Sequence, residues 1–337
     1  MKKLVDRLLK ANEFYLFLVI VVLAVVIELR SGQFFTPNNL VDIANAMIVP
    51  GLFAVGAYMV IISGGIDVSF PALASLAVYA TTSFLVGHGF EGSLLIPFAM
   101  VIALGAALGA FNGIFSSRLK APTLIITLGT ASVFSGVMQG ALKSVQIPKI
   151  PSSMESFGKA SLFTATNPES GLTSNMPVSF LVFVVVVILV FFTMRYTMFG
   201  RGILAIGGDE TSAARAGFNV KRTKFWLYVI VGVIAAVAGL IRTSMMGQMH
   251  PTNLLGTEML VIAAVVLGGT SITGGTGSIT GVILGTLLIT MVQNSMILLG
   301  VPTFWQGFTL GLLIIIGTGI TAVRAARASK RLAVKAI

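Results

Sequence analysis

Long apolar runs alternate with short polar or glycine-rich junctions along most of the chain. Most runs approach the ~20 residues that an α-helix needs to cross a bilayer core about 30 Å thick. The pattern predicts an all-α, polytopic integral membrane protein with about ten transmembrane helices. The expected spans are 14–29, 43–62, 67–87, 93–115, 121–142, 177–195, 225–246, 257–268, 278–298 and 304–323, of which the eighth is short for a full crossing.

The composition supports a membrane protein and leaves little room for domains outside the bilayer. Of 337 residues, 56% are hydrophobic and only 10% are charged, whereas soluble domains carry about 25% charged residues. Mean hydropathy is +0.98. We therefore expect residues 1–337 to form a single transmembrane domain in contact with membrane lipid.

The placement of basic residues predicts the orientation of the chain. An even number of spans puts both termini on one side of the membrane. If that side is the cytoplasm, 17 of the 22 Lys and Arg residues fall in cytoplasmic segments. Basic residues are enriched in cytoplasmic loops, so both termini are expected to be cytoplasmic. This bias accounts for the net charge of +11 without nucleic acid as a partner.

Two connections are longer than membrane geometry requires. The external loop 143–176 contains prolines and polar residues that argue against a span. It either contacts an extracellular partner or simply connects two helices. The cytoplasmic loop 195–224 contains a glycine pair followed by an alanine-rich stretch flanked by cations.

The segment 209–217 of this cytoplasmic loop is predicted to form a helix of about two turns. Asp209 is a good N-cap, and Gly217 stands where a C-cap glycine belongs. Helices shorter than ~12 residues are marginal in water. Another surface must therefore hold this helix, either on the protein itself or in a groove of a cytoplasmic partner.

Four segments of the chain resemble the ribose-type (sugar) permeases of bacterial ATP-binding-cassette importers, in the order of that family. The segments are ISGGIDVS at 62–69, FNGIFSSRLKAPTLIITLGT at 111–130, FGRGILAIGGDETSAARAGFNVKRTKFWLYVIVGVIAAVAGL at 199–240, and VVLGGTSITGGTGSITGVILGT at 265–286. The sequence departs from the family pattern at Asp209, where Asn is usual, and at 216–218 and 70–71.

The resemblance implies a multi-pass permease subunit in the bacterial inner membrane. In that family two permease copies form the pore, two cytoplasmic ATP-binding subunits power it, and an extracytoplasmic solute-binding protein delivers a pentose, hexose or related polyol. The second copy would be identical to this chain or homologous to it. The segment 209–217 is similar to the coupling helix that docks on the ATPase, with Asp209, Glu210, Ala213, Ala214, Arg215 and Gly217 as the expected contact residues.

ATP chemistry is expected on a partner subunit. The sequence contains no GxxxxGK[ST] phosphate-binding motif, and its glycine-rich segment 268–278 lacks the lysine. We therefore expect no cofactor on this chain, and ATP with Mg on the ATPase. With no cysteine and two histidines, the sequence also predicts no metal site and no catalytic site.

Neutral amides in the predicted spans are the candidates for a solute pathway. Polar side chains are costly in lipid and normally face the protein interior. Amides also donate to and accept from hydroxyl groups. Each of these side chains either contacts the solute or bonds a neighbouring helix. The candidates are Asn45, Asn112, Gln139, Gln293 and Asn294.

Glycines mark further structural positions. Gly64 and Gly65 separate two spans, and Asp67 after them is expected to cap the next helix. Three sets of glycines repeat every fourth residue and are expected to allow close helix packing. The sets are 105, 109 and 113; 277, 281 and 285; and 307 and 311.

Two other functional classes were weighed against the importer. An ion-coupled secondary carrier for a small polar solute would suit the glycine-broken spans at 64–65 and 268–277. Proton-coupled carriers usually place ionisable groups near the membrane midplane, and none lies near the middle of a predicted span. An integral membrane enzyme lacks candidate catalytic residues. Arg242 and Glu258 are expected to pair at the outer rim.

Overall fold

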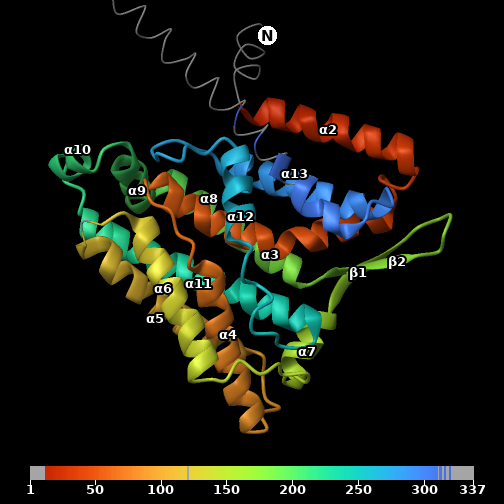
Figure 1. Ribbon diagram of the computed structural model, residues 1–337, viewed down its shortest axis with the longest axis horizontal. Coiled ribbons are helices and arrows are strands. Elements are labelled where there is room, and N and C mark those ends of the chain that lie inside the picture. The colour runs from red at the N-terminus through yellow and green to blue at the C-terminus, as the bar shows by residue number, and fades with distance from the viewer. Residues whose placement is uncertain (1–11, 120, 310, 313–314, 316–318, 320–337) are drawn as a thin grey trace, which may run out of the picture.

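The computed structural model describes residues 12–119, 121–309, 311–312, 315 and 319. Helices make up most of the described part, which confirms the predicted all-α membrane class (Figure 1). The elements are α2 (Asn12–Ser31), α3 (Pro37–Ile62), α4 (Phe70–Gly87), α5 (Leu95–Arg118), α6 (Thr123–Gly140), α7 (Ser152–Lys159), β1 (Ser161–Thr166), β2 (Thr173–Pro177), α8 (Ser179–Tyr196), α9 (Met198–Gly208), α10 (Glu210–Arg215), α11 (Val220–Met246), α12 (Glu258–Leu267), α13 (Ile279–Leu298) and the 3-10 turn η1 (Thr303–Trp305).

Eight of the described helices are long and apolar enough to cross a membrane: α2, α3, α4, α5, α6, α8, α11 and α13. They correspond to eight of the ten predicted spans. The short eighth prediction, 257–268, is a helix of ten residues, α12. The tenth, 304–323, lies largely outside the described residues. The total number of spans and the side of the termini stay predictions.

α12 is a half-length helix that stops inside the protein. It ends at Gly268, and a glycine-rich loop over 268–278 turns the chain back into α13. Ser278 caps α13, since its hydroxyl accepts from the amide of Gly281 at 3.0 Å. The same hydroxyl donates to a carboxylate oxygen of Glu13, 2.6 Å away on α2. Ser278 therefore fixes the end of this loop to the first turn of α13 and to the start of α2.

The helices divide into a buried group and a peripheral group. In α3 and α11, 83% and 67% of the most apolar stretch is buried, whereas in α2 and α8 only 22% is buried. All four are strongly apolar, so the exposed apolar faces of α2 and α8 must meet lipid or another subunit rather than water. The buried helices α3 and α11 contact each other, and α11 also contacts α4.

Glycines bring α5 and α11 together at backbone distance, as the spacing predicted. A side chain at Gly105 would meet the carbonyl oxygen of Gly232 at 2.7 Å, and one at Gly109 would collide with the carbonyl of Tyr228. The set on α13 packs on α12 in the same way. Gly307 and Gly311 have no neighbour within 4 Å among the described residues, so packing by this set is not seen.

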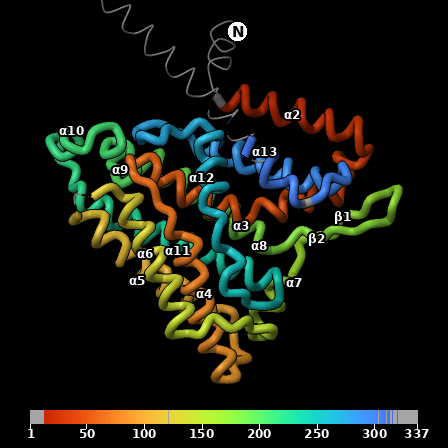
Figure 2. Tube along the Cα trace, viewed as in Figure 1, coloured from red at the N-terminus to blue at the C-terminus, as the bar shows by residue number. Residues whose placement is uncertain are grey.

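The two ends of the molecule differ, as Figures 1 and 2 show. α10 lies at the left end of the view, and the hairpin of β1 and β2 lies at the right end. Contacts between loops join segments that alternation of the spans places on the same side. Ile147 and Met249 exchange backbone hydrogen bonds on the predicted outer side, and Gly275 donates to Ile62 on the predicted inner side. These contacts agree with the predicted alternation.

The external loop contains structure that the sequence analysis did not predict. α7 and an antiparallel hairpin of β1 and β2 occupy most of residues 143–176. The prolines and polar residues there excluded a span, but the segment lacks the long alternating apolar pattern that signals a strand. The hairpin depends instead on cross-strand partners and on contact with α3.

The packing of α5 on α11 yields a stability prediction. We expect Gly109→Val to destabilise the protein by about 1–3 kcal/mol or more, because overpacking forces the two backbones apart. Thermal unfolding of the purified protein in detergent measures the change. Gly136→Val on α6 is the matched control, since no atom lies within 4 Å of a side chain there. Equal melting temperatures of the two variants would contradict this packing.

Candidate functional site

The predicted short cytoplasmic helix is present as α10, with both of its predicted caps. Asp209 is the N-cap, and its Oδ1 accepts from the amide of Ser212 at 2.6 Å. Hydrogen bonds from Ser212, its side chain first and its amide second, hold the pKa of Asp209 below the ordinary value. Gly217 follows the helix with φ +90°, and the amide of Phe218 donates to Ala213. The cap is therefore ionised and intact at neutral pH.

One side of α10 rests on the protein itself and the other side is free. Ala213 is only 3% exposed. A carboxylate oxygen of Glu210 lies 2.5 Å from Nζ of Lys224 on α11. Ala214 and Arg215 are exposed. Ala213 thus docks on this chain, as the first hypothesis expects. Ala214 and Arg215 are accessible, and docking of this side on a partner stays a prediction.

Three pairs of glycines meet beneath α10, and we call them the glycine junction. They are Gly64–Gly65 after α3, Gly207–Gly208 at the end of α9, and Gly274–Gly275 in the loop before α13. The amide of Gly275 donates to the carbonyl of Ile62 at 2.9 Å. A side chain at Gly207 would overlap that same carbonyl. The junction therefore requires backbone-to-backbone contact between three distant segments.

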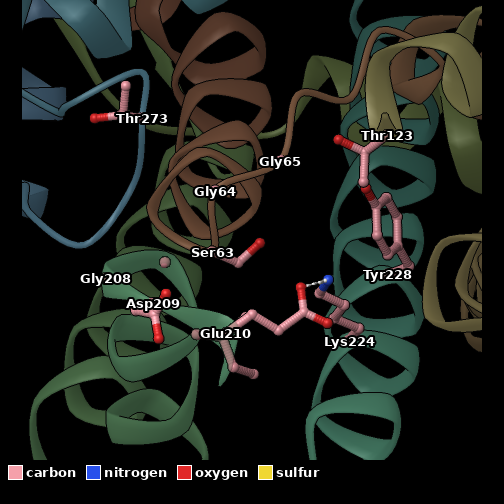
Figure 3. Close-up of a pocket in the computed structure, with 12 residues that line it drawn as sticks. Ser63, Gly64, Gly65, Thr123, Gly208, Asp209, Glu210, Lys224, Tyr228 and Thr273 are labelled. Atoms are coloured by element: carbon pink, nitrogen blue, oxygen red, sulfur yellow. Dashed lines mark hydrogen bonds and ion pairs between the residues drawn. The ribbon is translucent and has the colours of Figure 1, made fainter. Parts of the chain in front are cut away.

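A cavity of about 260 Å³ opens beside this junction (Figure 3). In the figure the carboxylate of Glu210 points across the opening toward Lys224, and Tyr228 stands next to Thr123. The cavity connects α10 to the inner ends of α3, α6 and α11. Its lining consists of Ser63, Gly64, Gly65, Thr123, Ile206, Gly207, Gly208, Asp209, Glu210, Lys224, Tyr228 and Thr273.

Asp67 and Asn112 belong to a buried hydrogen-bond chain near this junction. Oδ1 of Asp67 accepts from both the amide and the hydroxyl of Ser69, each at 2.7 Å. The hydroxyl of Ser69 in turn accepts from Nδ2 of Asn112 at 2.7 Å. The expected capping role of Asp67 needs correction, because α4 starts at Phe70 with Ser69 as its N-cap. Asn112, 1% exposed, links α5 to this turn.

A second and larger cavity, which we call the outer cavity, lies at the opposite end of α3, the end predicted to face outward. It has a volume of about 450 Å³ and lies between α3, α11, α12 and α13. The structure brings two of the predicted pathway residues together here, Asn45 and Gln293. The complete lining is Asp42, Asn45, Ala46, Val49, Pro50, Phe53, Arg242, Met245, Met246, Asn253, Leu254, Thr257, Leu260, Val261 and Gln293.

The other predicted pathway residues lie outside both cavities. Nδ2 of Asn294 donates to Oδ1 of Asn39 at 2.8 Å and so links α13 to α3. Gln139 is exposed on α6, away from the cavity linings. Polarity within a predicted span thus gave five candidates, and the packing of neighbouring helices determines that only Asn45 and Gln293 line one of these cavities.

Three cavity residues were missed or misjudged from the sequence. Asp42 lies one residue before the predicted span 43–62, so the sequence did not mark it as a pathway candidate. Arg242 was expected to pair with Glu258, and this is wrong: within the described residues Glu258 accepts only from the amide of Gly256, at 3.3 Å. Asn253 follows α11 in a loop that carried no motif. Asp42 lies far from the other two in the sequence, and only the fold brings all three into one cavity.

The fold is that of a multi-pass membrane protein, and comparison with known proteins gives its family. A family model described as "Branched-chain amino acid transport system / permease component" matches residues 39–317. The chain belongs to this family of permeases, which includes permease components of ATP-binding-cassette importers.

Similar proteins extend over most of the chain. The ribose import permease protein RbsC of Escherichia coli (strain K12) is 33% identical over 290 residues, which cover 85% of this chain and 86% of that protein. The probable ABC transporter permease protein YphD of the same strain is 32% identical, with coverage of 98% and 95%. The autoinducer 2 import system permease protein LsrC of Yersinia enterocolitica is 32% identical, with coverage of 78% and 69%.

The glycine junction makes a prediction that compares two adjacent residues. Gly207→Ala places a methyl group against the carbonyl of Ile62, whereas Gly208→Ala meets no atom within 4 Å. We expect Gly207→Ala to break the hydrogen bond of Gly275 and to speed deuterium exchange of loop 268–278 by about tenfold, the equivalent of 1.4 kcal/mol. Gly208→Ala should exchange like the unmodified protein. Unchanged exchange in Gly207→Ala would exclude a tight junction.

Proposed function

We propose that this chain is the membrane-spanning subunit through which an ATP-driven importer moves a sugar or sugar-like solute by alternating access. A separate cytoplasmic ATPase binds ATP and Mg and docks on α10 through the exposed residues Ala214 and Arg215. Asp209, Glu210 and Gly217 set the ends of that helix, and Ala213 anchors it to the chain. The free face of α10 supports this assignment, because Ala214 and Arg215 stay exposed on a helix whose other side is fixed to the protein through Ala213.

The observation that carries the proposal is the path of α3. The carbonyl of its last residue, Ile62, is held by the glycine junction under α10. Its outer half, from Asp42 to Phe53, forms one wall of the outer cavity. A displacement of α10 at the inner surface is therefore transmitted by one continuous helix to the place where a solute would enter.

The partners follow from the family. An extracytoplasmic solute-binding protein would deliver the solute to the outer face, where α7 and the hairpin project (Figure 1). A second permease copy, identical or homologous, would cover part of the exposed apolar surface in the bacterial inner membrane. Relatives are named for ribose and autoinducer 2, and a xylose transport system permease protein of Haemophilus influenzae is 28% identical. A sugar-like solute suits the amides of the outer cavity.

Reconstitution tests this function. Proteoliposomes containing this chain, its ATPase and a loaded solute-binding protein should accumulate radiolabelled D-ribose or D-xylose only when ATP is inside the compartment facing α10. A proton or sodium gradient should not replace ATP. The alternative, an ion-coupled carrier, draws on the broken α12 and predicts gradient-driven uptake by this chain alone. Gradient-driven accumulation without the ATPase would contradict the importer.

The exposed face of α10 provides a mutational test of coupling. Ala214→Glu places an acidic side chain beside Glu210 and in the expected contact with the ATPase. An unpaired charge at such an interface costs several kcal/mol, so we expect ATP-driven uptake to fall at least about tenfold while the protein stays folded. Ala141→Glu, at an exposed position after α6, is the matched control and should transport normally. Normal uptake by Ala214→Glu would remove α10 from the docking surface.

A further inference from the structure

The outer cavity contains two opposite charges that do not pair with each other. Asp42 on α3 and Arg242 on α11 both line it. Neither takes part in an ion pair within the residues that the structure describes. Both lie about one or two helical turns from the outer ends of their helices, where an unpaired charge needs water or a ligand as a partner. The cavity thus holds a carboxylate and a guanidinium with free hydrogen-bonding capacity.

The α3 wall of the cavity presents further acceptors next to Asp42. Oδ1 of Asn45 is buried and has no hydrogen-bond partner among the residues that the structure describes. Pro50 has no amide hydrogen, so the carbonyl of Ala46 lacks its usual donor four residues on. Residues 42, 45, 46 and 49 lie three or four apart, and hence on one face of α3. Asp42, Asn45 and the carbonyl of Ala46 therefore place oxygen acceptors on the α3 wall of the cavity.

Donors occupy the facing helices and loop. Arg242 supplies several N–H groups, and Gln293 on α13 supplies an amide. Nδ2 of Asn253 donates to the sulfur of Met246 at 2.8 Å, a weak acceptor that a hydroxyl oxygen would replace favourably. The ring of Phe53 lies among the apolar lining residues. Donors and acceptors therefore face each other across about 450 Å³, a volume within the usual range for small-molecule sites.

We propose that Asp42 and Arg242 determine the solute specificity of this chain by binding a neutral, polyhydroxylated molecule of monosaccharide size in the outer cavity. Asp42 accepts from two neighbouring hydroxyls, and Asn45 accepts from a third. Arg242 donates to oxygen atoms on the opposite edge of the solute. This proposal rests on the proposed function and names the residues that select its solute.

A neutral polyol fits the cavity better than a zwitterionic amino acid. An amino acid would satisfy the two charges, but its apolar side chain would leave Oδ1 of Asn45 without a donor. Unsatisfied buried polar groups cost about 1–3 kcal/mol each. A polyol carries hydroxyls around its whole ring and can reach the charged and the neutral groups together.

The absence of cysteine permits a direct test in the intact chain. Ala46→Cys would place a single thiol at an exposed, small position of the cavity lining. Its rate of reaction with a membrane-impermeant thiosulfonate is measured in membranes, with and without ~100 mM D-ribose, D-xylose or D-glucose. For a dissociation constant of roughly 10 mM, the bound sugar should slow labelling about tenfold. Ser93→Cys, exposed in another outer loop and outside the cavity, should label at the same rate throughout.

The charged residues are then tested in the Ala46→Cys background. Asp42→Asn and Arg242→Gln each remove a charge-assisted hydrogen bond, so the affinity for sugar should fall about tenfold and protection at ~100 mM sugar should drop from about tenfold to about twofold. An unchanged labelling rate without sugar shows that each variant keeps the cavity. Protection that persists in both variants would overturn the proposal, as would no protection by any of the three sugars.

L-leucine serves as the opposing probe. Protection by L-leucine in place of sugar would assign the cavity to a zwitterion and overturn the polyol proposal. These outcomes do not depend on the ATPase. Sugar protection together with failed ATP-driven uptake would refute the importer and keep the site, whereas ATP-driven uptake without protection would refute the site alone.

Discussion

Backbone contact at the glycine junction is the constraint on which the rest of the structure depends. The carbonyl of Ile62 accepts from Gly275 and lies directly against Gly207, so three chain segments meet with no side chain between them. Contacts of this kind cannot slide without breaking a hydrogen bond or colliding, because protein interiors are close-packed. The ends of α3 and α9 and the loop before α13 are therefore held as one unit beneath α10.

α3 connects this unit to the outer cavity and explains why the two sites belong to one mechanism. Most of the helix is buried among apolar neighbours, yet its outer turns present Asp42 and Asn45 to a cavity. Close packing along most of α3 couples its inner end to its outer turns, where the proposed solute would bind. The exposed apolar faces of α2 and α8 have a different role, since they meet lipid or another subunit.

The sequence predicted whatever depends on local pattern. Hydrophobic runs gave the membrane class and eight crossing helices, and the caps at Asp209 and Gly217 gave α10. The spacing of Gly105 and Gly109 predicted close helix packing, and the structure shows that the partner is α11. Features that depend on distant neighbours were not predictable. They are the location of Asp42 and Arg242 in the lining of one cavity, the burial of Asn112 in a hydrogen-bond chain, and the hairpin of β1 and β2. Burial of Ala213 against the protein itself likewise needed the fold.

The most direct test of this account is the side of the membrane on which α10 lies. A single cysteine at Ala214, introduced into the cysteine-free chain, can be labelled with an impermeant maleimide in right-side-out and inside-out membrane vesicles. The account predicts rapid labelling in inside-out vesicles only, and protection of that cysteine when the ATPase is bound. Labelling from the outside would place α10 away from any cytoplasmic ATPase and would contradict the mechanism.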